Sequence, residues 1–147
     1  MFEFAPVAEA DFGDLLALRI AVMRESLERV GRFDPQRAAQ RFRSTFRAAQ
    51  TRRIHVGGEA AGCVATWDEA EALRVEHFYL AARFQRLGLG GAVLRRLFDE
   101  APPYAQCFRV GALRGSDANR FYRRHGFVQV SESEWDIEYE RPRAPPD

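Results

Sequence analysis

Residues 76–91 read EHFYLAARFQRLGLGG, an apolar run followed by a glycine-rich loop. The apolar run predicts a strand, and a helical pattern begins at Leu89. The first turn of a helix carries unpaired backbone N–H groups and the positive end of the helix dipole. Glycines let such a backbone close around an anion, so the stretch predicts a phosphate-binding loop that needs no lysine. It is not the dinucleotide-binding fingerprint, because Val93 occupies the position of the third glycine.

The charge composition excludes several classes of function. All 22 basic residues are arginines, so neither a P-loop lysine nor a Schiff-base lysine is available. The formal net charge of +1 gives no large field for nucleic acid or an acidic membrane surface. The arginines between Gln36 and Arg53 alternate with apolar residues, which indicates a solvated helix face.

The cysteines and the N-terminus indicate a cytoplasmic protein without a metal centre. Cys63 and Cys107 lie far apart in apolar segments, with neither metal-ligand nor redox spacing. We expect two buried thiols in a reducing compartment. The opening residues MFEF lack the charged and apolar regions of a signal peptide, and no apolar run reaches the length of a membrane span.

Hydrophobic periodicity predicts an α/β (α+β) chain with a mixed, mostly antiparallel sheet of six to seven strands and helices on both faces. Strands are expected at 2–7, 53–56, 62–67, 73–80, 107–113, 127–130 and 135–139. Helices are expected after caps at Asp11 and Asp34, at 89–100, and at 116–124 behind a Ser116 cap. No linker or repeat interrupts the pattern, so we expect a single domain over 1–141 and a flexible tail over 142–147.

Two motifs resemble the GNAT superfamily of acyltransferases. Residues 85–90, QRLGLG, are similar to its pyrophosphate-binding motif, and residues 118–127, ANRFYRRHGF, to its late alanine, tyrosine and Gly-Phe motif. The motifs occur in the family's order, and the predicted elements match its topology, so the resemblance covers nearly the whole chain. It implies a GNAT fold with a splayed pair of parallel strands, and an N-acetyltransferase that uses acetyl-CoA as co-substrate without a metal.

The resemblance also implies which residues contact the coenzyme. They are Phe78, Tyr79, Leu80, Gln85, Arg86, Leu87, Gly88, Leu89, Gly90, Gly91, Asn119 and Tyr122.

The resemblance further assigns catalytic roles. Tyr122 would donate a proton to the departing thiolate, and the backbone N–H of Phe78 or Leu80 would polarise the thioester carbonyl. Related enzymes place an acidic residue or a histidine at the position of Glu76, which would take the amine proton directly or through a water. Strand alternation puts Glu76 on the face of Leu80 and of Arg74, and an ion pair with Arg74 would make Glu76 a weaker base. His77, on the opposite face, is either a packed core residue or the base.

The acceptor is expected to be a primary amine of a small molecule. In the family the first two helices hold the acceptor, which implies Arg24, Glu28 and Phe33 here; a solvated charged face is the alternative. Two other functions stay open: an acyl-CoA-binding sensor without turnover, and acetylation of a protein N-terminus or lysine. Many relatives pair through their late strands, so the resemblance allows a homodimer.

Overall fold

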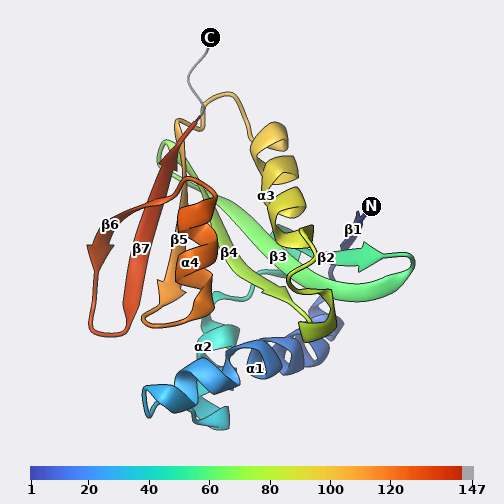
Figure 1. Cartoon of the computed structure of the whole chain (residues 1–147). Coiled ribbons are helices and arrows are strands. Elements are labelled where there is room, and N and C mark those ends of the chain that lie inside the picture. Colours follow the sequence, from blue (N-terminus) through green and yellow to red (C-terminus); the bar gives the residue numbers. More distant parts are fainter. Residues whose placement is uncertain (144–147) are drawn as a thin grey trace. The chain divides into compact units, whose positions relative to one another are not determined.

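The computed structural model describes residues 1–143 as a mixture of helices and strands (Figure 1). The helices are α1 (Phe12–Arg29), α2 (Pro35–Thr45), α3 (Leu89–Glu100) and α4 (Asp117–Arg124), with short 3-10 turns η1 (Glu9–Asp11), η2 (Ala48–Gln50) and η3 (Ala82–Phe84). The strands are β1 (Glu3–Pro6), β2 (Thr51–Val56), β3 (Glu59–Glu69), β4 (Ala72–Leu80), β5 (Cys107–Leu113), β6 (Val128–Glu132) and β7 (Asp136–Pro142). The predicted mixed α/β class is confirmed, and most elements lie within a few residues of their expected ranges.

The seven strands pair in the order β1-β2-β3-β4-β5-β7-β6. The pairs β1–β2, β2–β3, β5–β7 and β6–β7 are antiparallel, whereas β4 and β5 are parallel. The parallel ladder starts at Ala72 with Cys107 and its described register ends at Arg74 with Arg109. β5 nevertheless continues to Leu113. The predicted pair of parallel strands is confirmed.

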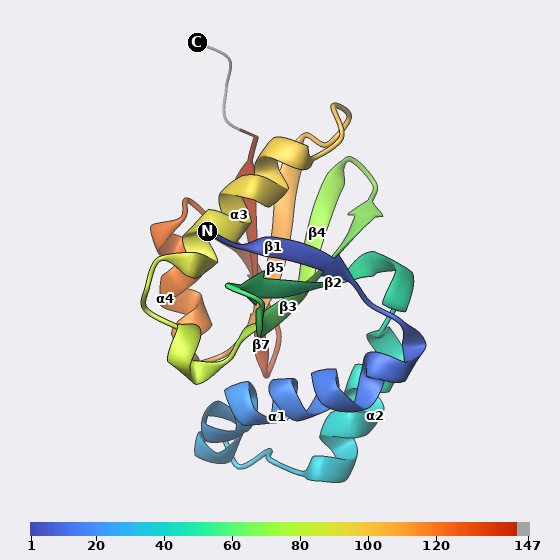
Figure 2. The same ribbon diagram turned by 90° about the vertical axis from the view of Figure 1, so that its right-hand side faces the viewer.

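The described chain forms two compact units, of which the first comprises Met1–Ala65 and His77–Gly90. In this unit α1 and α2 lie side by side (Figure 2). Their contact is aromatic: the rings of Phe12, Phe42 and Phe46 lie within 5.4 Å of one another, centroid to centroid. Leu15 and Cys63 complete this buried cluster. The regularly spaced apolar residues of both helices therefore cover a core, as predicted.

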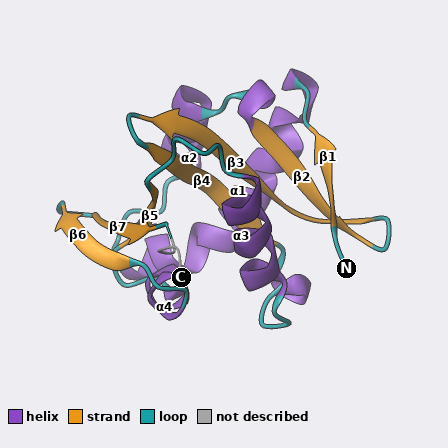
Figure 3. Cartoon of the chain, turned by 90° about the horizontal axis from the view of Figure 1, so that it is seen from above, coloured by secondary structure: helices purple, strands orange, loops and turns teal. Residues whose placement is uncertain are grey.

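The second unit comprises Thr66–Glu76 and the chain from Gly91 onward. Here β5, β7 and β6 follow one another, with α4 beside β5 (Figure 3). Phe98 of α3 stacks on Phe108 of β5 with ring centroids 4.3 Å apart. Tyr139 of β7 is fully buried. The alternation of buried Tyr139 with the less buried Glu138 and Glu140 is the predicted pattern of a strand with one covered face.

Three helix starts differ in their capping. Asp34 caps α2 as predicted, because its Oδ1 accepts hydrogen bonds from the backbone N–H groups of Gln36 and Arg37. Ser116 occupies the N-cap position of α4, but its side chain makes no cap bond. The Asp11 side chain likewise makes no cap bond to α1, so the prediction of this cap is wrong. Its carboxylate binds the N–H of Ala8 and the guanidinium of Arg53 instead.

The termini and cysteines complete the comparison with the sequence. Arg143 donates to the carbonyl oxygens of Ala101, Pro102 and Ala105, while residues 144–147 of the predicted tail lie outside the described part of the chain. Cys63 is buried as predicted, whereas Cys107 is only partly buried because it lies at the start of β5. No helix within residues 1–143 has both the length and the apolar character needed to cross a bilayer.

Candidate functional site

The predicted phosphate loop lies in the first unit, between β4 and α3. Gln85 donates from Nε2 to the carbonyl oxygen of Leu80 at 2.8 Å, which ties the loop to the end of β4. Arg86 and Gly88 have left-handed φ values of +63° and +83°, and Leu87 between them does not. Left-handed residues of this kind occur in loops whose backbone N–H groups bind anions. The loop leads directly into the first turn of α3, where backbone N–H groups have no partner within a helix.

The strand residues that the resemblance places beside the pantetheine arm are partly buried. Phe78, Tyr79 and Leu80 form the end of β4. β3 approaches this segment closely, because a Cβ built on Gly62 would lie 2.1 Å from the carbonyl oxygen of Tyr79. The N–H of Ala81 donates to the carbonyl oxygen of Ala61 at 2.8 Å. These contacts join β3 to the end of β4, just before the loop.

His77 is a buried core residue with an unusual backbone. Its φ is +48°, in the left-handed region, and the residue is 6% exposed. Nε2 lies 2.8 Å from Thr45 Oγ1, Nδ1 lies 3.2 Å from the Tyr79 hydroxyl, and the ring packs edge-on against Phe42. Burial, followed by the charge of Arg19, lowers the pKa of His77 to about 4. His77 is therefore neutral at pH 7 and a weak base.

The left-handed residue also changes one expectation about β4. Strand alternation predicted that Glu76 and Leu80 share a face. His77 interrupts the extended backbone between them, so regular alternation no longer supports that expectation, which stays a prediction. The physical cause is not visible in the sequence, where the alternation looks regular.

Arg19 of α1 is a polar residue of the first unit that the sequence did not single out. Its Nε donates to the Tyr79 hydroxyl at 3.3 Å. Its Nη1 is buried and has no hydrogen-bond partner among the described residues. Arg19 shares α1 with Arg24 and Arg29, so only the fold distinguishes it.

The three predicted acceptor residues contact one another at the surface of the first unit. Arg24 Nε lies 3.3 Å from Glu28 Oε2, and both side chains are more than half exposed. The Arg24 guanidinium lies 4.5 Å from the centroid of the Phe33 ring. These contacts are those of a solvated helix face, the alternative that the spacing also allowed.

Tyr122 lies in the second unit, on α4, with a buried ring. Its side chain packs against Phe121, Phe127 and Tyr139, and the residue is 6% exposed. Its hydroxyl takes part in none of the hydrogen bonds described within residues 1–143. Burial, followed by the charge of Glu76, raises the pKa of Tyr122 well above its usual range, against a smaller opposing effect of Arg74. The phenol is therefore protonated at neutral pH.

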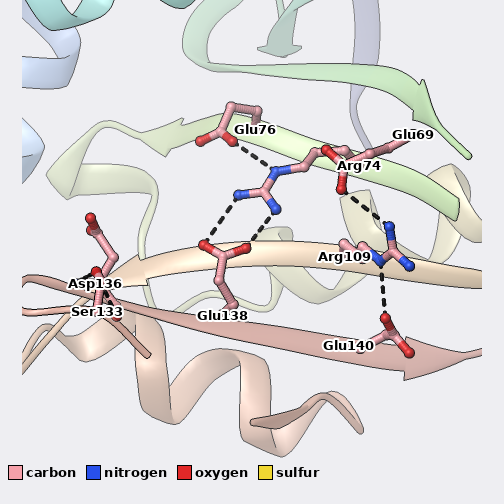
Figure 4. Close-up of polar contacts among 8 residues, drawn as sticks. All are labelled: Glu69, Arg74, Glu76, Arg109, Ser133, Asp136, Glu138 and Glu140. Carbon is pink, nitrogen blue, oxygen red and sulfur yellow. Dashed lines mark hydrogen bonds and ion pairs between the residues drawn. The ribbon is translucent and has the colours of Figure 1, made fainter. Parts of the chain in front are cut away.

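Glu76 lies in the same unit and pairs with Arg74, as its position two residues along the strand predicted. Arg74 Nε donates to Glu76 Oε2 at 3.0 Å, and the guanidinium also contacts Glu138 of β7 (Figure 4). The partner Glu138 could not be predicted from local spacing. Glu76 Oε1 takes part in none of the ion pairs described.

The two remaining coenzyme candidates of this unit are engaged in packing. Asn119 is 6% exposed, and its amide binds Leu113, Ser116 and Tyr139. Gly91 is buried, and a Cβ there would lie 2.7 Å from Cε1 of His125. Among the described residues no group of three or more His, Cys, Asp or Glu side chains is arranged to hold a metal ion.

Comparison with solved structures gives many chains of the same fold. An acetyltransferase from Thermus thermophilus superposes with a TM-score of 0.72 at 18% identity, covering 97% of each chain. An N-acetyltransferase from Thermoplasma acidophilum in complex with coenzyme A has a TM-score of 0.71 at 12% identity, over 97% of this chain and 99% of that one. An N-acetylglutamate synthase from Neisseria gonorrhoeae, complexed with coenzyme A and N-acetylglutamate, has a TM-score of 0.66 at 14% identity, over 99% of this chain and 36% of that one.

Sequence comparison identifies the family. Comparison with curated protein sequences gave no match. The profile of the acetyltransferase (GNAT) domain, in contrast, matches residues 46–129, more than half of the chain and the part that contains both motifs. The chain belongs to the GNAT acetyltransferase family.

Proposed function

We propose that the protein transfers an acetyl group from acetyl-CoA directly to the primary amine of a small molecule, with residues 1–141 as its catalytic domain. The observation that carries this proposal is the loop at 85–90, where left-handed residues at 86 and 88 precede the first turn of α3. The unpaired backbone N–H groups of a glycine loop at a helix start suit a pyrophosphate. Coenzyme A in the structure of the Thermoplasma relative supports the same ligand here.

The transfer needs a base, a polarised carbonyl and a proton donor. Glu76 takes a proton from the amine, directly or through a water, and the nitrogen then bonds to the acetyl carbon. A backbone N–H of Phe78 or Leu80 stabilises the carbonyl oxygen while the carbon–sulfur bond breaks and its electron pair moves to sulfur. Tyr122 gives its hydroxyl proton to that sulfur and regains one from solvent. The protonated, unpaired phenol of Tyr122 supports this role.

Glu76 is favoured over His77 as the base. His77 is buried, bound at both ring nitrogens, and has a pKa of about 4, so it accepts a proton poorly at neutral pH. Glu76 keeps one carboxylate oxygen outside the ion pair with Arg74. The ion pair is also the observation that favours the second candidate, an acyl-CoA-binding sensor, because a neutralised carboxylate is a weak base.

Ligand-dependent melting tests the coenzyme site first. A ligand at about 100 times its Kd stabilises the folded state by about 2.7 kcal/mol, so acetyl-CoA should raise the Tm of wild type and of Tyr122→Phe. Gly90→Glu, which puts an anion into the loop, should abolish the shift. Gly13→Glu is the matched control, since Gly13 lies in the first turn of α1 with open space around its Cα. A wild type that does not shift contradicts the proposal.

Coenzyme release then separates the candidate functions. Free thiol is followed with acetyl-CoA and a panel of alkylamines, diamines and amino acids, and separately with peptides bearing a free N-terminus or lysine. Release with small amines supports the proposal. Binding without any release supports the sensor, and release with peptides alone supports a protein acetyltransferase.

A further inference from the structure

Arg74 lies between two carboxylates from different strands of the second unit. Its Nη1 contacts Glu138 Oε1 at 2.6 Å and its Nη2 contacts Glu138 Oε2 at 3.4 Å, while its Nε contacts Glu76 Oε2 at 3.0 Å (Figure 4). Glu138 therefore accepts hydrogen bonds from the two terminal nitrogens of the guanidinium, and Glu76 accepts one from Nε. The Arg74 side chain is 15% exposed, so these bonds are shielded from most solvent.

A glycine makes room for this arrangement. A Cβ built on Gly111 of β5 would lie 2.6 Å from Glu138 Oε2 and 3.0 Å from Arg74 Nη2. The ion pair between Arg74 of β4 and Glu138 of β7 thus crosses the backbone of β5, the strand between them. Any side chain at position 111 would displace it.

We propose that Arg74 and Glu138 are positioning residues for Glu76. Glu138 anchors the guanidinium, and the anchored guanidinium holds Glu76 in one rotamer with Oε1 directed away from the pair. The inference rests on the proposed function only in that Glu76 is the base. A guanidinium is suited to this task because its planar fork fixes direction, which an ammonium group does not.

The second carboxylate also limits how far Arg74 weakens the base. One positive charge is shared between two negative charges, so the group of three has a net charge of −1. An arginine paired with Glu76 alone would stabilise the ionised carboxylate more strongly and reduce its affinity for a proton. Glu138 therefore lets Glu76 be held in place and still accept a proton.

Other charged and titratable groups of the second unit surround this trio. The Tyr122 phenol of α4 interacts electrostatically with both Glu76 and Arg74. Arg109 of β5 lies next along the sheet and pairs with Glu69 of β3 and Glu140 of β7 (Figure 4). Arg109 of β5 and Glu140 of β7 form a second ion pair that shares strand β7 with the first, which provides a matched control.

The test is the titration of the Glu76 carboxylate by ¹³C NMR in the full chain labelled at glutamate. The Glu76 signal is assigned by its loss in Glu76→Gln. We expect its titration midpoint to rise in Arg74→Met, which removes a neighbouring cation, and to fall in Glu138→Gln, which removes a neighbouring anion. Glu140→Gln, which removes a carboxylate paired with Arg109 instead, should leave it unchanged. Opposite shifts would show that both charges act on Glu76, and kinetics then test whether this matters for the reaction.

Kinetics complete the test with the amine that gives the fastest thiol release. The acid limb of the pH profile of kcat/KM should move in the same directions, and Arg74→Lys should lower kcat while keeping the wild-type midpoint. Unmoved midpoints in both Arg74→Met and Glu138→Gln would overturn the inference. If Glu138→Gln does not fold, the results for Arg74→Met and Arg74→Lys decide whether the inference holds. Full activity of Glu76→Gln would instead overturn the assignment of the base within the proposed function.

Discussion

The Tyr139 hydroxyl donates a buried hydrogen bond to Asn119 Oδ1 at 2.8 Å. The amide nitrogen of the same side chain donates to the carbonyl oxygens of Leu113 and Ser116, each at 2.9 Å. Asn119 therefore joins the end of β5, the start of α4 and the middle of β7. A buried amide with its polar atoms satisfied in this way stabilises the fold.

Replacement of Asn119 by alanine should destabilise the protein by about 3 kcal/mol, because several buried polar groups lose their partner. Urea denaturation measures the loss, with Gln129→Ala as a control for an exposed amide of the same unit. Acetyl-CoA affinity of the folded variant should stay close to wild type. Unchanged stability together with lost coenzyme binding would instead support the coenzyme contact that the resemblance implied for Asn119.

Gly62→Ala should destabilise the protein by about 3 kcal/mol, because the new Cβ meets the backbone oxygen of Tyr79 at 2.1 Å and β3 must move away from β4. Gly13→Ala is the control: its Cβ meets nothing within 4 Å, and alanine favours a helix, so stability should rise by about 0.5 kcal/mol. Thermal unfolding distinguishes the two. Equal stabilities for both variants would show that β3 and β4 are less closely packed than described.

His77 should make stability depend on pH between 6.5 and 4. Its pKa of about 4 in the folded chain lies below the ordinary 6.5, so the unfolded chain binds the proton more readily in this range. The stabilising effect of the neutral ring is complete above 6.5 and is lost as the pH falls through 4, by about 3 kcal/mol. His77→Asn, which also tolerates a left-handed φ, should lose less stability than wild type between pH 7 and 4 in urea titrations. Parallel curves for the two proteins would contradict the pKa.

Tyr122→Phe should lower kcat roughly 100-fold, the usual effect of removing a general acid, while Tm stays near that of wild type. The hydroxyl makes no described hydrogen bond, so its loss leaves no buried partner unsatisfied. Because burial raises the pKa of Tyr122, the wild-type enzyme should not lose activity through its ionisation below pH 10. Steady-state thiol release and differential scanning calorimetry provide the measurements. Undiminished kcat would remove Tyr122 from the mechanism.

Features fixed by local sequence could be predicted. The strand, loop and helix around residues 76–91 follow from apolar spacing and glycines, and the pair of Arg74 with Glu76 follows from the two-residue period of a strand. Asp34 was a correct cap because the side chain and its N–H partners are neighbours in the chain.

Features that depend on residues distant in the sequence could not be predicted. Glu138 lies 64 residues from Arg74, and Arg19 lies 60 residues from Tyr79. The left-handed φ values of His77 and Arg86 have no sequence signal, because both residue types usually adopt negative φ. For His77 the left-handed φ depends on the surrounding residues, because the ring is held by Thr45, 32 residues away. The alternation argument that placed Glu76 and Leu80 on one face could not take account of this interruption of the strand.

The buried Cys63 thiol can report on local unfolding of the first unit. Burial raises the pKa of the Cys63 thiol to about 12, so a thiol-directed reagent can attack it only after the first unit opens. Cys107 belongs to the second unit and is partly accessible at the start of β5. Since these are the two cysteines of the chain, mass spectrometry after timed alkylation would assign each modification to one unit. The rate at Cys63, with and without acetyl-CoA, would then measure how strongly the coenzyme closes the first unit.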